Sequence, residues 1–312
     1  VHAPAPSWGL GVVLLDFDED GHPDIYVGND SLANFLFRGL GERRFEDVGL
    51  MGGIAYNETG SGQATMGIAV GDVDGNGLAD LFTTNFMYDT NTLHVNLGDL
   101  RFEDRTRQYG LYIDGRPFLS WAATFCDFDH DCDEDVIFFN GHIYPHEVCE
   151  RQNWQYAQVP VLYRREPETF VRLTPEQAGA WLGERHSDRC ASFADLDADG
   201  DVDIVVCERN DRARVLRNDR DGGNWLQVAL DDRRPGHERR GIGSKVVLRA
   251  GEQVQTRWLV SGTGFLSASP YVAHFGLDEG TSQVDLEVTW TDGFVQQLQG
   301  VATRSSLVIE RE

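Results

Sequence analysis

Hydrophobic and polar positions alternate along the first two thirds of the chain in a pattern that predicts pairs of short β-strands joined by acidic turns. Short apolar runs stand on both sides of every turn. The runs before the turns are 12–15, 68–70, 122–125 and 191–193, and the runs after them are 25–27, 81–83, 136–139 and 204–206. We therefore expect each turn to connect two strands of one sheet.

The four acidic turns share one pattern, with a carboxylate or amide at positions 1, 3, 5 and 9 of nine residues. They read DFDEDGHPD at 16–24, DVDGNGLAD at 72–80, DFDHDCDED at 127–135 and DLDADGDVD at 195–203. Alternate acidic residues on a tight turn direct several oxygens at one centre, and Ca²⁺ tolerates such an all-oxygen site best. A single copy would fit a solvated acidic turn equally well, but four copies between strands favour metal binding. An EF-hand needs flanking helices and an acid at position 12, and neither pattern is present.

We predict one Ca²⁺ site at each turn, up to four in all. The predicted side-chain ligands are Asp16, Asp18, Asp20 and Asp24; Asp72, Asp74, Asn76 and Asp80; Asp127, Asp129, Asp131 and Asp135; and Asp195, Asp197, Asp199 and Asp203. The backbone carbonyls of position 7 complete the shells, from His22, Leu78, Asp133 and Asp201. Cys132 stands at position 6 of the third turn, where the other turns have Gly, so we expect that turn to be distorted or to bind more weakly.

The turns recur with a period that indicates a β-propeller or a related array. Their first Asp residues fall at 16, 72, 127 and 195, which gives spacings of 56, 55 and 68 residues. An insertion at 140–160 explains the longest spacing. It contains His142 and His146, but Pro145 between them argues against a helix that would align the two rings for a metal. We expect this segment to be an excursion that packs on neighbouring blades or contacts a partner.

Near Asn224 the acidic turns stop and a second all-β segment begins. Strand-like runs lie at 224–230, 244–250, 255–260, 284–290 and 305–310, separated by Gly-rich turns. The chain therefore divides into a propeller part, 1–222, and a small antiparallel sandwich or barrel, 223–312. The basic stretch 233–240 is interpreted as a solvated turn.

The phase of the repeat predicts that four units do not close a ring. The chain enters the pattern just before the first turn, and segment 1–8 contains two prolines, which makes it a poor closing strand. We expect an open arc with exposed apolar side chains on its first blade, and upstream blades of a longer chain as one partner.

Charge and cysteine content narrow the function. The formal net charge is −24, and four Ca²⁺ ions would leave about −16, which argues against a nucleic acid partner. No apolar run is long enough for a transmembrane helix. Among five cysteines, Cys190 and Cys207 lie on the strands around the fourth turn and either face each other or are buried free thiols.

The turns with their strands resemble FG-GAP/VCBS repeats, the blades of integrin-α-like propellers. The C-terminal segment resembles the ASPIC/UnbV domain at 224–226, 241–243, 262–265, 274–277, Trp290 and 292–293, and NGHIYP at 140–145 is typical of the same combination. The chain thus resembles the cartilage-acidic-protein-type (CRTAC-like) family. The resemblance implies a Ca²⁺-loaded propeller followed by a small β domain in a secreted, periplasmic or cell-surface protein. One bacterial branch of the family is associated with enediyne biosynthesis clusters.

The leading expectation is a calcium-binding extracellular scaffold for protein or carbohydrate interaction, including adhesion. The alternative is an enzyme or accessory protein of a natural-product, enediyne-type pathway. We find no hydrolase, metalloprotease, P-loop or dinucleotide motif, and we predict no catalytic residue and no organic cofactor. The alternative would draw on His142, His146 and His186. A lectin is suggested by Trp121, Tyr144, Trp154 and Trp181, although aromatic residues in propellers more often pack between blades.

Overall fold

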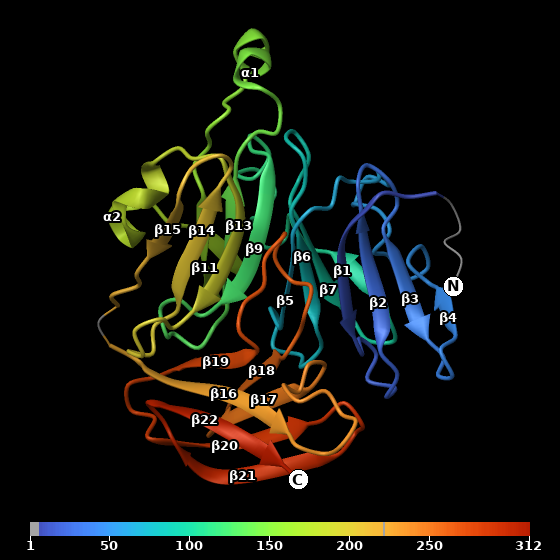
Figure 1. Cartoon of the computed structure of the whole chain (residues 1–312), viewed down its shortest axis with the longest axis vertical. Helices are drawn as coiled ribbons and strands as arrows, with labels where there is room; N and C mark the ends of the chain where they lie inside the picture. The colour runs from blue at the N-terminus through green and yellow to red at the C-terminus, as the bar shows by residue number, and fades with distance from the viewer. Residues whose placement is uncertain (1–5, 221) are drawn as a thin grey trace.

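The computed structural model describes residues 6–220 and 222–312, which form four blade-like sheets and a C-terminal pair of sheets (Figure 1). Blade 1 contains β1 (Gly9–Leu15), β2 (Asp24–Asn29), β3 (Phe35–Gly39) and β4 (Phe45–Asp47). Blade 2 contains β5 (Ile68–Gly71), β6 (Asp80–Thr83), β7 (Thr92–Asn96) and β8 (Phe102–Asp104). Blade 3 contains β9 (Ser120–Cys126), β10 (Asp135–Asn140), β11 (Val161–Glu166) and β12 (Thr169–Arg172). Blade 4 contains β13 (Asp188–Ala194), β14 (Asp203–Glu208) and β15 (Ala213–Leu216). The all-β prediction is confirmed.

Each acidic turn joins the first two strands of a blade, as the hydrophobic pattern predicts. The strands pair antiparallel directly across the turn, for example Leu15 with Asp24 and Cys126 with Asp135. Blade 4 has three strands among the described residues, because the chain leaves β15 for the C-terminal sheets. This agrees with the sequence. After the two strands around the fourth turn, only one further strand-like run, RVLRND at 214–219, precedes the C-terminal segment.

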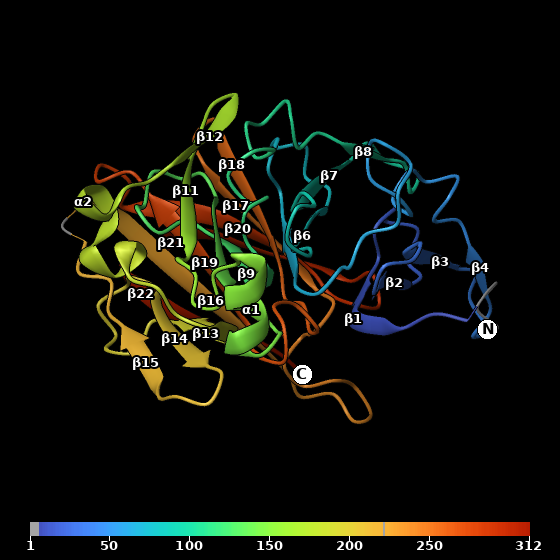
Figure 2. The ribbon, with the colours of Figure 1, turned by 90° about the horizontal axis from the view of Figure 1, so that it is seen from above.

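Consecutive blades pack through shared apolar cores. One core joins blades 1 and 2, a second joins blades 2 and 3, and a third joins blades 3 and 4. No core cluster of the residues in 6–220 and 222–312 joins blade 1 to blade 4, and the blades follow an arc (Figure 2). The apolar side chains of β1 alternate between the core and the surface. Leu10, Val12 and Leu14 are 42%, 43% and 47% exposed, so the expected exposure on the first blade is confirmed. Part of segment 1–8, judged a poor closing strand, lies outside the described residues.

The insertion between β10 and β11 projects from the side of the arc that lies away from the C-terminal sheets (Figure 1). It contains a short helix that the sequence analysis did not anticipate, α1 (His146–Gln152), which begins directly after Pro145. Proline is tolerated there because it precedes the first helical turn. Two further short helical segments, α2 (Pro175–Ala178) and η1 (Ala180–Gly183), connect blades 3 and 4. None of the described helices is long and apolar enough to cross a membrane.

The C-terminal sandwich, residues 224–311, consists of two facing sheets around one apolar core. One sheet has the order β19-β16-β22, formed by β19 (Val272–Leu277), β16 (Asn224–Asp232) and β22 (Ser305–Arg311). The other has the order β18-β17-β20-β21, formed by β18 (Gln253–Trp258), β17 (Lys245–Ala250), β20 (Gln283–Thr289) and β21 (Val295–Ala302). Strands β16 and β22 run parallel, so one sheet is mixed, and β19 and β21 add to the five strands expected from sequence.

A loop of the C-terminal sandwich, residues 261–271 between β18 and β19, contacts the first strand of every blade. It lies against Val12 of β1, where a Cβ on Gly262 would stand 2.0 Å from the Val12 carbonyl oxygen. Gly264 exchanges two backbone hydrogen bonds with Ile68 of β5. Phe265 packs on Trp121 of β9 at 4.9 Å between ring centroids. Its contacts with β13 are hydrogen bonds between Ser192 and Ala268 and between Phe193 and Ser269. This inserted loop therefore links all four blades.

Candidate cation-binding turns

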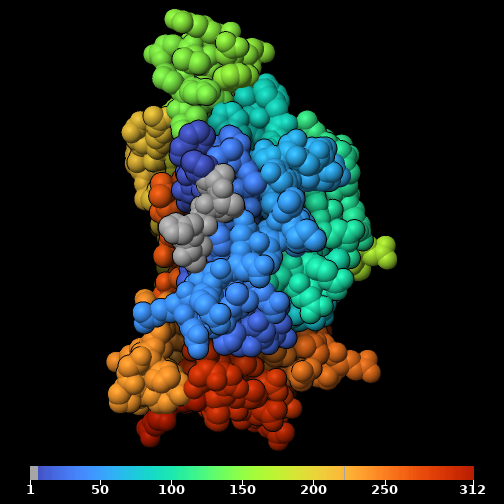
Figure 3. Space-filling view, turned by 90° about the vertical axis from the view of Figure 1, so that its right-hand side faces the viewer, coloured from blue at the N-terminus to red at the C-terminus, as the bar shows by residue number. Residues whose placement is uncertain are grey.

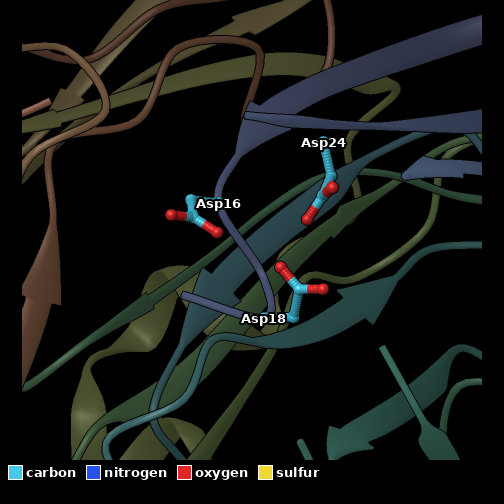
Figure 4. Close-up of side chains that lie close together, drawn as sticks. All are labelled: Asp16, Asp18 and Asp24. Atoms are coloured by element: carbon cyan, nitrogen blue, oxygen red, sulfur yellow. The ribbon is translucent and has the colours of Figure 1, made fainter. Parts of the chain in front are cut away.

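Each acidic turn gathers three carboxylates whose oxygens lie within 4.8 Å of one another. In the first three turns these are positions 1, 3 and 9: Asp16, Asp18 and Asp24; Asp72, Asp74 and Asp80; Asp127, Asp129 and Asp135. In the fourth turn they are positions 1, 3 and 5: Asp195, Asp197 and Asp199. In the first turn the three side chains converge on the space between the two arms of the turn (Figure 4).

Hydrogen bonds within each turn fix the predicted ligands of positions 1 and 5. The position 1 carboxylate accepts the backbone N–H of position 6, as Asp16 does from Gly21 at 2.8 Å. The same bond recurs from Gly77 to Asp72, from Cys132 to Asp127 and from Gly200 to Asp195. The position 5 side chain accepts the N–H of position 7, at Asp20, Asn76, Asp131 and Asp199. Asp20, Asp131 and Asp203 fall outside the four close groups, which consist of carboxylates alone and therefore do not include Asn76. For all sixteen predicted side chains, and for the carbonyls of His22, Leu78, Asp133 and Asp201, the role of cation ligand stays a prediction.

Position 9 has a second role that the sequence analysis missed. In blade 1 the buried Asp24 carboxylate accepts the N–H of Phe17 at 2.9 Å and that of Gly39, at the end of β3, at 2.8 Å. The same two bonds reach Asp80 from Val73 and Asn96, Asp135 from Phe128 and Arg165, and Asp203 from Leu196 and Asn218. Position 9 therefore ties the turn to the third strand of its blade, and a buried carboxylate with two such bonds is well satisfied.

The donor set fits a divalent cation. Asp18 Oδ1, Asp72 Oδ1 and Asp129 Oδ1 are buried and accept no hydrogen bond, although buried polar atoms normally have a partner. Each position 3 carboxylate also has one arginine near it, at 2.9 Å for Arg38–Asp18 and 3.6 Å for Arg105–Asp74. The corresponding pairs in the other turns are Arg220–Asp129 and Arg217–Asp197. One guanidinium cannot balance three carboxylates, so each turn keeps an excess of negative charge.

Burial disturbs the ionisation of these carboxyl groups. It is the largest cause that raises the pKa of Asp24 to about 7 and that of Asp135 to about 9. Burial also raises the pKa of Asp127 to about 7, and the neighbouring Asp131 carboxylate adds to this shift. Burial and the nearby Glu134 carboxylate raise the pKa of Asp72 to about 6. The charged state of the turns is therefore costly without a cation.

The third turn is not distorted by Cys132. Cys132 adopts a φ of 80°, in the region that favours glycine, and its N–H still donates to Asp127 at 2.9 Å. The carboxylates of the turn converge as in the first two turns. The expected distortion is therefore wrong, whereas weaker cation binding by this turn stays a prediction.

The three histidines of the alternative function do not form a metal group. His142 is fully buried and stacks on Trp154 at 5.1 Å, whereas His146 lies on the surface of α1 and pairs with Glu150. His186 Nδ1 lies 2.6 Å from a carboxylate oxygen of Glu208. Among the residues of 6–220 and 222–312, the close groups of potential metal ligands contain only aspartates.

The four aromatic residues considered for a lectin differ in exposure. Trp121 is buried against Phe265, and the half-buried Trp181 packs on Phe139 with centroids 5.6 Å apart. Tyr144 and Trp154 stack on each other beside α1, and Tyr144 is 45% exposed. Among these four residues, Tyr144 is the most exposed.

The C-terminal sandwich packs on the acidic turns, on the side of the arc opposite α1 (Figures 1 and 3). Lys245 donates to the carbonyl of Gly77 at 2.9 Å and pairs with Glu19, which connects the first two turns. Arg257 pairs with the buried Glu134 of the third turn at 3.1 Å, and Glu134 in turn accepts the N–H of Asp72.

The third and fourth turns make the closest contacts with the C-terminal sandwich. Gly276 lies so near the third turn that an added Cβ would stand 2.0 Å from Asp127 Oδ2. Gln227 donates to Asp195 Oδ2 at 2.8 Å, and the ring of Trp225 covers Gly200. The turns therefore have two roles, because they hold carboxylates together and also form the surface on which the C-terminal sheets sit.

Comparison with known proteins agrees with this arrangement. Residues 16–83 and 72–138 match the FG-GAP-like repeat, and residues 234–312 match the family described as ASPIC and UnbV. The chain is homologous to cartilage acidic protein 1, with 28% identity over 298 residues to the Xenopus tropicalis protein and 28% over 299 residues to the Homo sapiens protein. These alignments cover 91% of this chain but 42% and 41% of the relatives, so the chain spans less than half the length of the curated relatives it matches.

Among solved structures, an Agrocybe aegerita lectin described as recognising non-reducing terminal N-acetylglucosamine has a TM-score of 0.36 at 18% identity, over 68% of this chain and 54% of the lectin. A lectin from Burkholderia pseudomallei has a TM-score of 0.35 at 12% identity, over 96% of this chain and 85% of the lectin. Scores this low carry no argument about fold or ligand.

Two glycines at position 6 test the contact between the turns and the C-terminal sandwich. Gly21 and Gly200 both have a positive φ, of 87° and 102°, but nothing lies near a Cβ on Gly21, whereas a Cβ on Gly200 would meet Trp225 at 1.8 Å. Gly21→Ala should cost about 1 kcal/mol from backbone strain alone. Gly200→Ala should cost about 1–3 kcal/mol more, because the Trp225 ring must move. Urea unfolding of both variants measures the difference, and equal destabilisation would show that the contact with Trp225 is unimportant.

The raised pKa values predict an inverted pH dependence without cations. The folded state holds protons on Asp24 and Asp127 up to about pH 7, whereas the unfolded state releases them near pH 4. The stability that these protonated groups contribute is complete below pH 4 and is lost as the pH rises to about 7. In EDTA the melting temperature should therefore fall between pH 5 and pH 8, whereas in excess Ca²⁺ it should rise, because protons compete with the cation. Thermal scans at a series of pH values check this, and parallel curves in the two buffers would contradict it.

Proposed function

We propose that this chain, a homologue of cartilage acidic protein 1 with FG-GAP-like repeats and an ASPIC and UnbV segment, is a calcium-binding extracellular scaffold for a protein or glycan ligand. The observation that carries the proposal is the recurrence of one converging carboxylate group at the same strand-joining turn of four successive blades. In a secreted, periplasmic or cell-surface setting, Ca²⁺ would be available to these turns.

Calcium fits the turns better than the neighbouring arginines do. The donors are hard carboxylate oxygens, three per turn, and several of them are buried without a hydrogen-bond partner. The paired guanidiniums are partly exposed, with Arg38 at 43% and Arg217 at 61% of the side chain, and exposed ion pairs contribute little. A bound divalent cation supplies the missing positive charge. The chain's own contribution is to fix positions 1 and 9 through backbone hydrogen bonds before the cation arrives.

We propose that the scaffold consists of two parts, the blades at 1–222 and the C-terminal sandwich at 223–312. The ligand would bind on the side of the arc that carries α1, since the C-terminal sandwich covers the opposite side. The half-exposed Tyr144 stacks there on Trp154, and the rings present a flat apolar surface of the kind that sugars and peptides pack on. The alternative role in a natural-product pathway stays a hypothesis.

Removal of calcium should destabilise the protein. Each ion binds only the folded state. When the free Ca²⁺ concentration is 100 times the Kd of a site, binding there adds about 2.7 kcal/mol to the free energy of unfolding. EDTA should therefore lower the melting temperature by more than about 5 °C. Equilibrium dialysis should show that the double variant Asp16→Asn, Asp18→Asn binds one Ca²⁺ fewer than the parent. Asp99→Asn, whose side chain is 91% exposed outside the turns, is the matched control and should change neither quantity. Identical melting in EDTA and Ca²⁺ would remove the basis of the proposal.

The ligand can be approached with a glycan array. If sugars pack on the aromatic pair, the protein in Ca²⁺ should bind a subset of glycans, and Tyr144→Ala should weaken that binding at least about tenfold, as loss of a stacked aromatic contact implies. Tyr56→Ala, a partly exposed tyrosine away from α1, serves as the control. If the Tyr144→Ala variant binds glycans as strongly as the parent, the glycan site lies elsewhere on the protein. If no glycan on the array binds the parent, the result indicates a protein ligand.

A further inference from the structure

Blade 4 carries a pair of cysteines that has no counterpart in the other blades. Cys190 of β13 is the register partner of Cys207 of β14. The two residues stand five positions before the first Asp and four positions after the last Asp of the fourth turn. The same positions in blades 1, 2 and 3 hold Gly11 and Gly28, Gly67 and Thr84, and Ala122 and Phe139. The pair is therefore not a feature of the repeat.

The geometry brings the two sulfurs together. Directly opposed residues of antiparallel strands have Cα atoms about 4.5–5.5 Å apart, and their side chains lie on the same face of the sheet. A disulfide spans Cα separations of about 4.4–6.8 Å, so this pair can be bridged without moving the strands. Burial raises the pKa of the Cys190 thiol, and contact with the Cys207 thiol raises it further, as expected for neighbouring sulfur atoms.

The pair is also the accessible one. Ala191 and Phe193 of β13 are buried in the core shared with blade 3. Because side chains alternate along a strand, Cys190 and Ser192 face the opposite side of the sheet, away from that core. Val205 and Val215 continue this outer face, and Val215 is 62% exposed. Cys190 and Cys207 are both half-buried, whereas the remaining three cysteines are buried. A small oxidant can therefore reach this pair more easily than any other cysteine.

We propose that Cys190 and Cys207 form a cross-strand disulfide when the protein meets a small disulfide oxidant such as glutathione disulfide. One protein thiolate attacks a sulfur of glutathione disulfide and expels a glutathione thiolate, which leaves a mixed disulfide. The second protein thiolate then attacks the protein sulfur of that mixed disulfide and expels the second glutathione thiolate. Two protein thiols are oxidised, one glutathione disulfide is reduced to two glutathione molecules, and the two thiol protons pass to the released thiolates.

The disulfide would stabilise blade 4, which has fewer strands than the other blades among the described residues. Blade 4 lacks a fourth strand among the described residues, and its carboxylate group is the most exposed of the four. A disulfide between Cys190 and Cys207 encloses residues 191–206, and therefore the whole fourth turn, in one covalent loop. Closing this loop removes freedom from the unfolded chain and holds the two strands of the turn at a fixed separation.

The test counts free thiols in the full chain before and after incubation with glutathione disulfide. Alkylation in denaturant, followed by intact mass measurement, should show five free thiols in the reduced protein and three after oxidation. Peptide mapping should place the bond between Cys190 and Cys207. The Cys149→Ser variant is the matched control and should fall from four thiols to two. The Cys190→Ser and Cys207→Ser variants should form no internal bond, and either one suffices if the other does not fold.

A second readout follows the effect of the bond on the blade. The oxidised parent should melt at least about 2 °C above its reduced form, whereas the oxidant should not raise the melting temperature of Cys207→Ser. Five alkylated cysteines after prolonged oxidation, or a bond mapped to any other pair, would overturn the proposal. Neither result depends on calcium, so the outcome is separate from that of the proposed function.

Discussion

Repulsion among carboxylates at the strand-joining turns is the constraint on which the rest of the molecule depends. Two carboxylate oxygens within 4.8 Å repel by about 3 kcal/mol at an effective dielectric constant of about 20, and each blade repeats this cost around three groups. Two features offset it in every blade: backbone N–H groups that donate to positions 1 and 9, and one arginine beside position 3. In the first three blades, buried carboxylate oxygens without a hydrogen-bond partner are also left for a cation. Each blade therefore contains, at the turn between its first two strands, a group of carboxylates that repel one another.

The same turns determine where the C-terminal sheets can sit. The contact surface combines backbone of the turns, at Gly77 and Gly200, with acidic side chains such as Glu134. Side chains of the C-terminal sandwich reach into it: Lys245, Trp225 and Arg257. Arg257 and Glu134 form a buried ion pair, which is costly to separate because each charge would be left in an apolar setting. A disturbance of the third turn thus acts on the neighbouring sheets as well as on its own blade, whereas a surface loop would absorb it locally.

Much of this arrangement could be predicted from the sequence, because the acidic turns and their flanking apolar runs are local patterns. The double role of Asp24 could not, since its partner Gly39 belongs to a third strand whose position depends on the whole blade. Strand β21 escaped prediction because it is rich in glutamine and mostly exposed, so it has no apolar run. The cover of Trp225 over Gly200 joins two parts of the chain by packing alone, and no periodicity records such a contact.

The inserted loop at 261–271 also has a consequence for the order in which the molecule forms. It contacts Val12, about 250 residues earlier in the chain, and the first strands of the three later blades. During synthesis the blades leave the ribosome in sequence, and neighbouring blades can already share their cores. The loop that holds their inner strands together emerges afterwards. Contacts between residues so far apart in sequence form slowly, because the chain loses conformational entropy before these contacts can stabilise it. The nascent protein therefore passes through a stage in which the four blades have packed on one another but do not yet contact the loop at 261–271.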